Sequence, residues 1–204
     1  MEKQQLCDIL KKYMPEGVVD YAAHYMLEHR IHLRIAKPRK SIRGNYMPPS
    51  ENGQHRISVN RDLNPYAFTI TFFHEIAHLT NWNTHQFRVM AHGPEWKQEF
   101  RRVMTPVSTA QILPADVQTA LDNYLSRPKA STCSDPNLMR TLRRYDKQTG
   151  QNLVEELPPG SLFRLQNGLV MRKGEKRKTR FLCSEHLSGK QYLVHGLAVC
   201  ERIT

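Results

Sequence analysis

The chain has 204 residues, of which 39% are hydrophobic and 24% are charged, and this balance excludes a disordered or fibrous protein. No apolar run approaches the roughly 18 residues of a membrane-spanning helix, and the first residues lack the apolar segment of a signal peptide. We therefore expect a cytoplasmic protein without a membrane partner. The formal net charge of +11 favours nucleic acid or another polyanion as a partner.

The first part of the chain predicts two helices followed by short strands. Apolar residues recur at helical spacing over residues 2–14, and Pro15 suits the first turn of a second helix that runs to about His29. From Ile31 the apolar residues alternate, which is typical of a half-buried strand. We expect three short strands, the last two forming a hairpin, at residues 31–35, 41–46 and 55–59.

Three helix-start signals follow. Asn64-Pro65 predicts a helix over residues 64–82, with asparagine as the N-cap and proline at the first helical position. A Gly-Pro pair and a further proline predict two more helices, over residues 95–104 and 114–125.

The stretch 126–137 is polar, contains two prolines and has no periodicity, so we place a domain boundary within it. The predicted domains are residues 1–128 and residues 129–204. The second domain predicts a small antiparallel β-module, with strands at residues 162–165, 169–171, 180–183, 192–194 and 197–200. The predicted fold class is therefore α+β: a helical core with a short antiparallel sheet, followed by this module.

The segment from His74 to His78 reads HEIAH and matches the HExxH pattern. Histidines four residues apart lie on one helix face, so both can bind one metal ion, and Glu75 between them is placed to accept a proton from water. On a helical wheel both histidines lie opposite the apolar arc, which argues against two core histidines. That arc consists of Phe68, Phe72, Phe73, Ile76 and Leu79.

A catalytic zinc ion normally has a third protein ligand. By spacing alone, His85, Glu95 and Glu99 are candidates. We favour His92, because the Gly-Pro turn that follows it would fix this residue at the entrance of the next helix.

The pair of segments HEIAHL and HGPEWKQEF resembles the SprT-like family, which includes the Spartan proteases, over roughly residues 5–125. The resemblance implies that His74, His78 and His92 bind one catalytic zinc ion and that Glu75 is the general base. It also implies a zincin-like metalloprotease core whose substrates are proteins bound or crosslinked to DNA.

Two further roles in such a site stay open. An edge strand next to the metal commonly holds an extended peptide substrate, and the Arg56–Asn60 strand is our candidate. Tyr46 and His85 are candidate donors to the developing oxyanion. An acceptor should also orient each metal-binding histidine, although the sequence does not identify it.

The four cysteines are widely spaced and contain no CxxC pair. Many SprT-like proteins carry a C-terminal zinc ribbon with paired cysteines, so we interpret the β-module as a degenerate ribbon without metal. A second, structural zinc ion is not expected. We predict buried free thiols instead, at Cys7, Cys133, Cys183 and Cys200.

A basic run over a predicted hairpin is the main candidate for nucleic-acid contact. Such a hairpin can bind DNA phosphates without reading sequence, although a solvated surface loop is the simpler interpretation. The run holds six cations and one anion: the cations are Arg172, Lys173, Lys176, Arg177, Lys178 and Arg180.

Three functions fit this sequence. The first is a zinc metallopeptidase that acts near DNA. The second is a non-proteolytic nucleic-acid-binding factor with a structural or regulatory zinc ion, and the third is a metal-dependent hydrolase of another bond. Glu75 favours chemistry, because a structural zinc ion needs no base.

Overall fold

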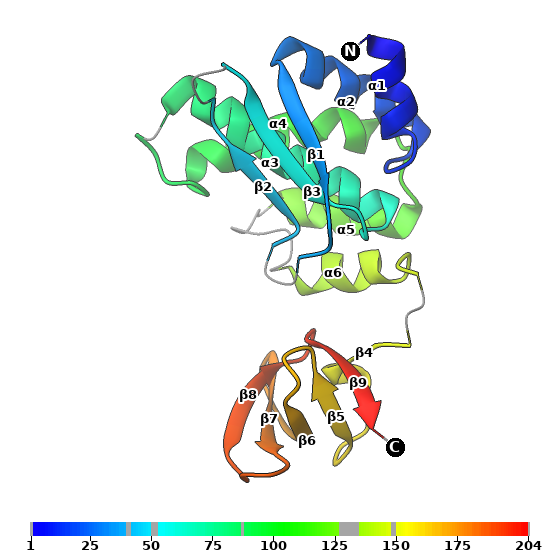
Figure 1. Ribbon diagram of the computed structural model, residues 1–204, viewed down its shortest axis with the longest axis vertical. Coiled ribbons are helices and arrows are strands. Elements are labelled where there is room, and N and C mark those ends of the chain that lie inside the picture. Colours follow the sequence, from blue (N-terminus) through cyan, green and yellow to red (C-terminus); the bar gives the residue numbers. More distant parts are fainter. Residues whose placement is uncertain are drawn as a thin grey trace. The chain divides into compact units, whose positions relative to one another are not determined.

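The computed structural model describes residues 2–39, 42–49, 53–86, 88–126, 135–147 and 150–203. The chain forms two compact units, Met1–Asp146 and Lys147–Thr204, and all α-helices of the described residues belong to the first (Figure 1). The predicted α+β class is therefore confirmed. Cys133 lies outside the described residues.

Among the residues that the structure describes, six α-helices form most of the first unit. They are α1 (Lys3–Leu10), α2 (Glu16–Glu28), α3 (Pro65–His85), α4 (Pro94–Thr109), α5 (Ala115–Ser126) and α6 (Pro136–Arg143). Helix α4 runs further than predicted and contains Pro106.

Helix α6 was not predicted, and it moves the boundary between the units. Its start repeats the signal of α3: the Asp135 side chain accepts the backbone N–H groups of Asn137 and Leu138, and a proline follows the cap. The helix buries Leu138 and Leu142 in the core of the first unit. The first compact unit therefore extends to Asp146, beyond the expected boundary at residue 128.

A three-stranded sheet completes the first unit, with β1 (Ile31–Ala36), β2 (Gly44–Met47) and β3 (His55–Asn60) in the order β1-β3-β2. The predicted hairpin is present, since β2 and β3 are antiparallel. Strand β1 runs parallel to β3, so the sheet is mixed and not antiparallel. Arg56–Asn60 was wrong as an edge strand, because β3 has a partner on each side, and the strand that borders α3 at the edge is β2.

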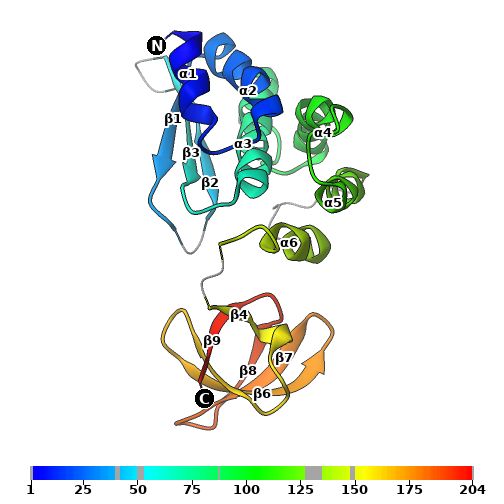
Figure 2. The same cartoon turned by 90° about the vertical axis from the view of Figure 1, so that its right-hand side faces the viewer.

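Helix α3 lies between this sheet and α4 (Figure 2). Asn64 caps it by accepting the backbone N–H groups of Tyr66 and Ala67. The helix is buried on nearly all sides, and the strip opposite the phenylalanine arc is also covered: Thr71 and Asn81 are buried. The histidine face is therefore largely covered, with His74 buried and His78 half-buried.

The second unit is a six-stranded antiparallel sheet in the order β4-β9-β5-β6-β7-β8. Its strands are β4 (Asn152–Leu153), β5 (Leu162–Leu165), β6 (Val170–Arg177), β7 (Arg180–Glu185), β8 (Gln191–His195) and β9 (Val199–Ile203). The module is antiparallel as predicted, and its core contains Phe163, Met171, Cys183 and Cys200.

The three described cysteines, Cys7, Cys183 and Cys200, are buried thiols, as expected. Among the described residues, no helix has both the length and the apolar character needed to cross a membrane.

Candidate metal centre

Three histidines converge in the first unit. His74 and His78 lie one turn apart on α3, and His92 lies in the turn that precedes α4. One ring nitrogen from each lies within 4.8 Å of the others, and Nε2 of His74 is 3.3 Å from Nε2 of His92. The structure thus brings together all three histidines that the sequence singled out.

The distance between the ring nitrogens of His74 and His92 fits a shared zinc ion. Two nitrogens bound to one tetrahedral zinc ion at about 2.0–2.1 Å are about 3.3–3.4 Å apart. The separation of 3.3 Å between His74 and His92 meets this value. Three imidazole ligands also leave one tetrahedral position for water or substrate, which is the pattern of catalytic sites.

Burial keeps these imidazoles in the neutral form that binds metal. Together with the smaller effect of the neighbouring histidine rings, it lowers the pKa of His74 to about 2 and that of His78 to about 3. Burial also lowers the pKa of His92. At neutral pH each ring therefore offers a lone pair, as metal binding requires.

Trp96 on α4 packs against the rings of all three histidines. The Trp96 ring centroid lies 4.6, 5.3 and 4.8 Å from the centroids of His74, His78 and His92. Trp96 is fully buried and stacks on Phe100 at 5.1 Å. Because the Gly-Pro pair starts α4 directly after His92, the start of this helix positions both His92 and Trp96.

The expected acceptor behind His74 is absent within the described residues. Nδ1 of His74 is buried without a hydrogen-bond partner there, whereas Nε2 faces His92. Packing against Trp96 therefore helps to position this ring, and no hydrogen bond at Nδ1 contributes within the described residues.

Glu75 lies on the neighbouring face of α3, against the edge strand β2. Its side chain is buried, and burial raises its pKa to about 8, opposed by a hydrogen bond from the backbone N–H of Tyr46 and by the charge of Arg39. Gly44 lies beside the same carboxylate. The carboxylate next in sequence to His74 is therefore held by the backbone of β2.

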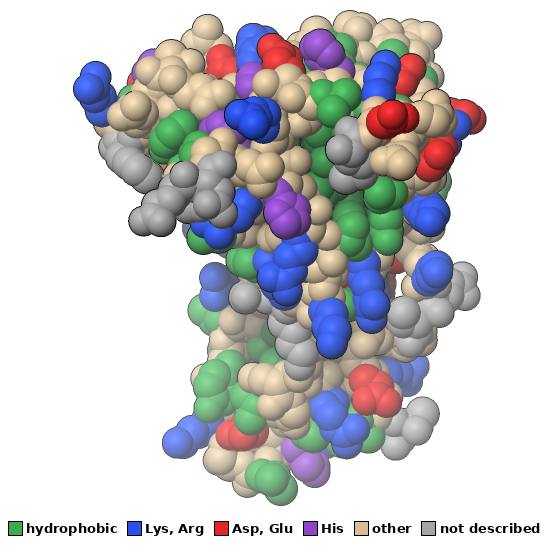
Figure 3. All heavy atoms as spheres, turned by 45° about the horizontal axis from the view of Figure 1, so that its top comes forward, with side chains coloured by type: hydrophobic (Ala, Val, Ile, Leu, Met, Phe, Trp, Pro, Cys, Tyr) green, Lys and Arg blue, Asp and Glu red, His purple; other side chains and the backbone are tan. Residues whose placement is uncertain are grey.

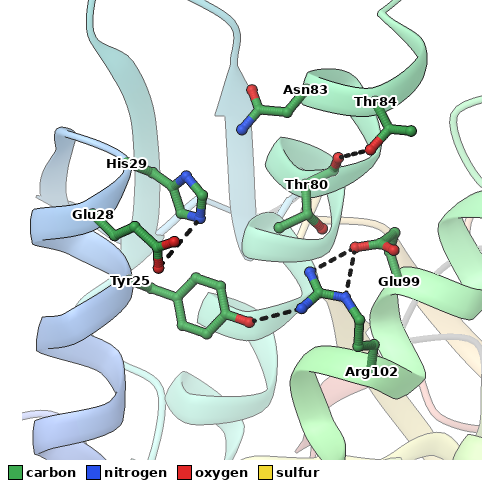
Figure 4. Close-up of a pocket in the computed structure, with 8 residues that line it drawn as sticks. All are labelled: Tyr25, Glu28, His29, Thr80, Asn83, Thr84, Glu99 and Arg102. Carbon is green, nitrogen blue, oxygen red and sulfur yellow. Dashed lines mark hydrogen bonds and ion pairs between the residues drawn. The ribbon is translucent and has the colours of Figure 1, made fainter.

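The alternative third ligands do not join the cluster. Glu99 accepts an ion pair from Arg102 at 2.8 Å and faces a polar pocket formed by α2, α3 and α4 (Figure 4). Burial raises the pKa of Glu99, but hydrogen bonds from Arg102 and Thr80 outweigh this effect and hold it below its ordinary value. His85 and Glu95 also lie outside the group of converging ligand atoms.

The candidate oxyanion donor Tyr46 contributes differently from the expectation. Its hydroxyl pairs with Nδ1 of His55 at 2.9 Å, and its ring stacks on His55. The part of Tyr46 that reaches the site is its main-chain N–H, at Glu75. Sequence patterns carry no signal for such a backbone contact.

The basic run forms the β6–β7 hairpin, as predicted. Lys173 was wrong as a phosphate contact, because its side chain is buried and donates to the carbonyls of Glu155 and Leu157. Its ammonium also lies 4.2 Å from the centroid of the Phe181 ring. The other five cations, Arg172, Lys176, Arg177, Lys178 and Arg180, are exposed.

Comparisons with known proteins agree with the motif. Neither the curated proteins nor the solved structures gave a match to the chain. The family model of the SprT-like family matches residues 18–118, a range that includes the sheet, α3, α4 and all three histidines. Residues 18–118 therefore form a domain of the SprT-like family.

Proposed function

We propose that the first unit is a zinc-dependent peptidase whose substrates are proteins bound or crosslinked to DNA. The observation that carries the proposal is the convergence of three neutral imidazoles, His74, His78 and His92, together with the buried carboxylate of Glu75, the residue next to His74 on α3. Membership of the SprT-like family supports a metalloprotease-type domain.

The histidines and Glu75 have different roles in the proposed peptide hydrolysis. A zinc ion bound by the three imidazoles supplies a Lewis acid and lowers the pKa of water. Glu75 takes up the proton of the attacking water and passes it to the amine that leaves when the C–N bond breaks. Burial raises the pKa of Glu75, which makes its carboxylate a stronger acceptor for the water proton.

The outer edge of β2 is the proposed site for an extended peptide. The backbone N–H of Asn60 donates to the carbonyl of Arg43 at 2.9 Å, and the register pairs Gly44 with Val59. In an antiparallel ladder, hydrogen-bonded pairs alternate with pairs whose N–H and C=O groups point away from each other. The backbone groups of Gly44 and Tyr46 therefore point to the outer edge of β2. Because Glu75 takes the N–H of Tyr46, a substrate strand would pair with the N–H and carbonyl of Gly44 and with the carbonyl of Tyr46.

The nucleic-acid part of the proposal rests on charge. Residues 147–204 contain ten Lys and Arg against five Asp and Glu, a net charge of +5. Lys and Arg side chains also lie on the surface of the first unit (Figure 3). Exposed cations on the β6–β7 hairpin favour contact with the phosphate backbone, which is independent of sequence.

A Glu75→Gln variant tests the proposed activity. Zinc content and cleavage of a protein crosslinked to DNA are measured for the wild type and the variant, with and without DNA. We expect the variant to retain zinc and to lose at least 100-fold in cleavage rate, because general-base catalysis contributes about 10²–10⁴-fold.

Glu99→Gln is the matched control, because this glutamate belongs to the Arg102 ion pair and not to the histidine cluster. It should keep both zinc and activity. Equal cleavage by the wild type and Glu75→Gln would refute the peptidase assignment. Cleavage that is unaffected by DNA would refute the proposed substrate class while leaving the peptidase in place.

A further inference from the structure

The edge strand β2 approaches the proposed general base unusually closely at one residue. A Cβ atom on Gly44 would lie 2.5 Å from Oε1 and 3.0 Å from Cγ of Glu75. Non-bonded atoms do not come this close, so any larger residue at position 44 requires Glu75 to move. The space that glycine leaves open is occupied by the carboxylate.

A second contact holds the carboxylate from the same strand. The backbone N–H of Tyr46 donates to Glu75. Gly44 and Tyr46 are two positions apart, and the alternation of the ladder directs the backbone groups of both toward the outer edge. One residue therefore provides room for the carboxylate, and the other provides its hydrogen bond.

We infer that Gly44 is a positioning residue, which lets the Glu75 carboxylate lie against the backbone of β2 at the N–H of Tyr46, where it acts as the base. This inference rests on the proposed function for its catalytic consequence. The contact of Glu75 with Gly44 and Tyr46 is independent of the proposed function. The side chain of Glu75 is flexible at its far end, so a substitution at Gly44 displaces the carboxylate more readily than it unfolds the unit.

A purely structural explanation must be separated from this one. The same Cβ on Gly44 would lie 2.7 Å from Cγ2 of Thr71, a β-branched residue one turn before Glu75 on α3. Crowding of Thr71 alone would push α3 and β2 apart without any specific effect on the base. Replacing Thr71 by serine removes that methyl group and keeps the hydroxyl.

The experiment compares Gly44→Ala with the double variant Gly44→Ala/Thr71→Ser. Gly17→Ala is the matched control, because its Cβ would lie 2.7 Å from Cγ2 of Ile112, so it creates a similar clash through the same chemical change. Zinc content, kcat and KM are measured on the full chain. Hydrogen exchange of the Tyr46 amide, relative to that of Asn45, is measured with and without zinc.

We expect Gly44→Ala to retain zinc, to lose at least tenfold in kcat with little change in KM, and to exchange the Tyr46 amide at least tenfold faster. The added Thr71→Ser change in the double variant should restore neither kcat nor the slow exchange of the Tyr46 amide. The control Gly17→Ala should change neither quantity. Unchanged kcat and Tyr46 exchange in Gly44→Ala would overturn the inference, and so would recovery of both in the double variant. If the wild type shows no Glu75-dependent cleavage, the proposed function fails, and the exchange rates still decide the contact.

Discussion

Nε2 of His74 and Nε2 of His92 lie 3.3 Å apart although the two residues are 18 positions apart in the chain. The contact depends on the crossing of α3 and α4, where Trp96 packs against both rings. The third ligand position is therefore a product of tertiary packing and not of local helix geometry.

The first prediction concerns the third ligand. His92→Ala should lower zinc affinity by about two orders of magnitude or more, since even an orienting partner of a ligand contributes about 10–100-fold. His85→Ala is the control and should bind zinc like the wild type, because His85 lies outside the converging group. A competition titration with a zinc chelator measures both, and equal affinities for the two variants would contradict this ligand set.

The second prediction concerns Asn64, which caps α3 and also joins it to α6. Its amide donates to the carbonyl of Leu142 at 2.8 Å and to Asp146 at 2.7 Å. Asn64→Ala should lower the free energy of unfolding by about 2–3 kcal/mol, combining the loss of a cap with that of buried hydrogen bonds. Urea unfolding followed by tryptophan fluorescence reports on the first unit alone, because both tryptophans of the chain lie there.

Asn123→Ala provides the control for this change. Asn123 is exposed within α5, so the loss of its amide should alter stability by less than about 0.5 kcal/mol. If both variants lowered the free energy of unfolding by a similar amount, the cap and the hydrogen bonds of Asn64 would contribute no more to stability than an exposed asparagine does.

The third prediction concerns pH and His55, whose pKa burial lowers, with a further lowering by the charge of His29. Below pH 6.5 the unfolded chain binds a proton at His55 more readily than the folded one, so stability is lost as the pH falls. In the metal-free protein, His55→Gln should make the decline between pH 7 and pH 5 shallower, by at most about 1.4 kcal/mol per pH unit. Unfolding free energies at several pH values give both slopes, and parallel slopes would contradict the shift.

The fourth prediction separates the exposed from the buried cations of the hairpin. Replacing Lys176, Lys178 and Arg180 by Gln, Asn and Gln should reduce the salt dependence of DNA affinity by about 0.9 per lost phosphate contact. Asparagine suits position 178, where the backbone φ is +54°. Lys173→Met should leave the slope unchanged, because its side chain is buried. A slope that the triple variant does not alter would exclude the hairpin as the DNA contact.

Most of the fold was predictable from local signals. Asn64-Pro65 marked the start of α3, and alternation marked the strands, because capping and periodicity are properties of short segments. Sheet order was not predictable in this way: whether β3 is central depends on where β1 returns after α2, and no local pattern encodes that placement.

In the site, too, some features were predictable from local sequence and others depended on tertiary packing. The histidine spacing was readable because helix geometry fixes it, and His92 followed from the turn beside it. The contact of Glu75 with Tyr46 was not readable, because a backbone N–H has no sequence signature. Lys173 was misinterpreted because a run of charges does not reveal which member turns inward to bind carbonyl groups.

The hydrogen bond between Asn64 and Asp146 sets a lower limit on the length of a fragment that keeps the first unit intact. A fragment that stops at residue 128 would lose α6 and with it both acceptors of the Asn64 amide. The Asn64 amide at the start of α3 would then be left without those partners, and the core would lose Leu138 and Leu142. Proteolytic trimming between the two units would therefore leave the first unit intact only if the cut fell after Asp146.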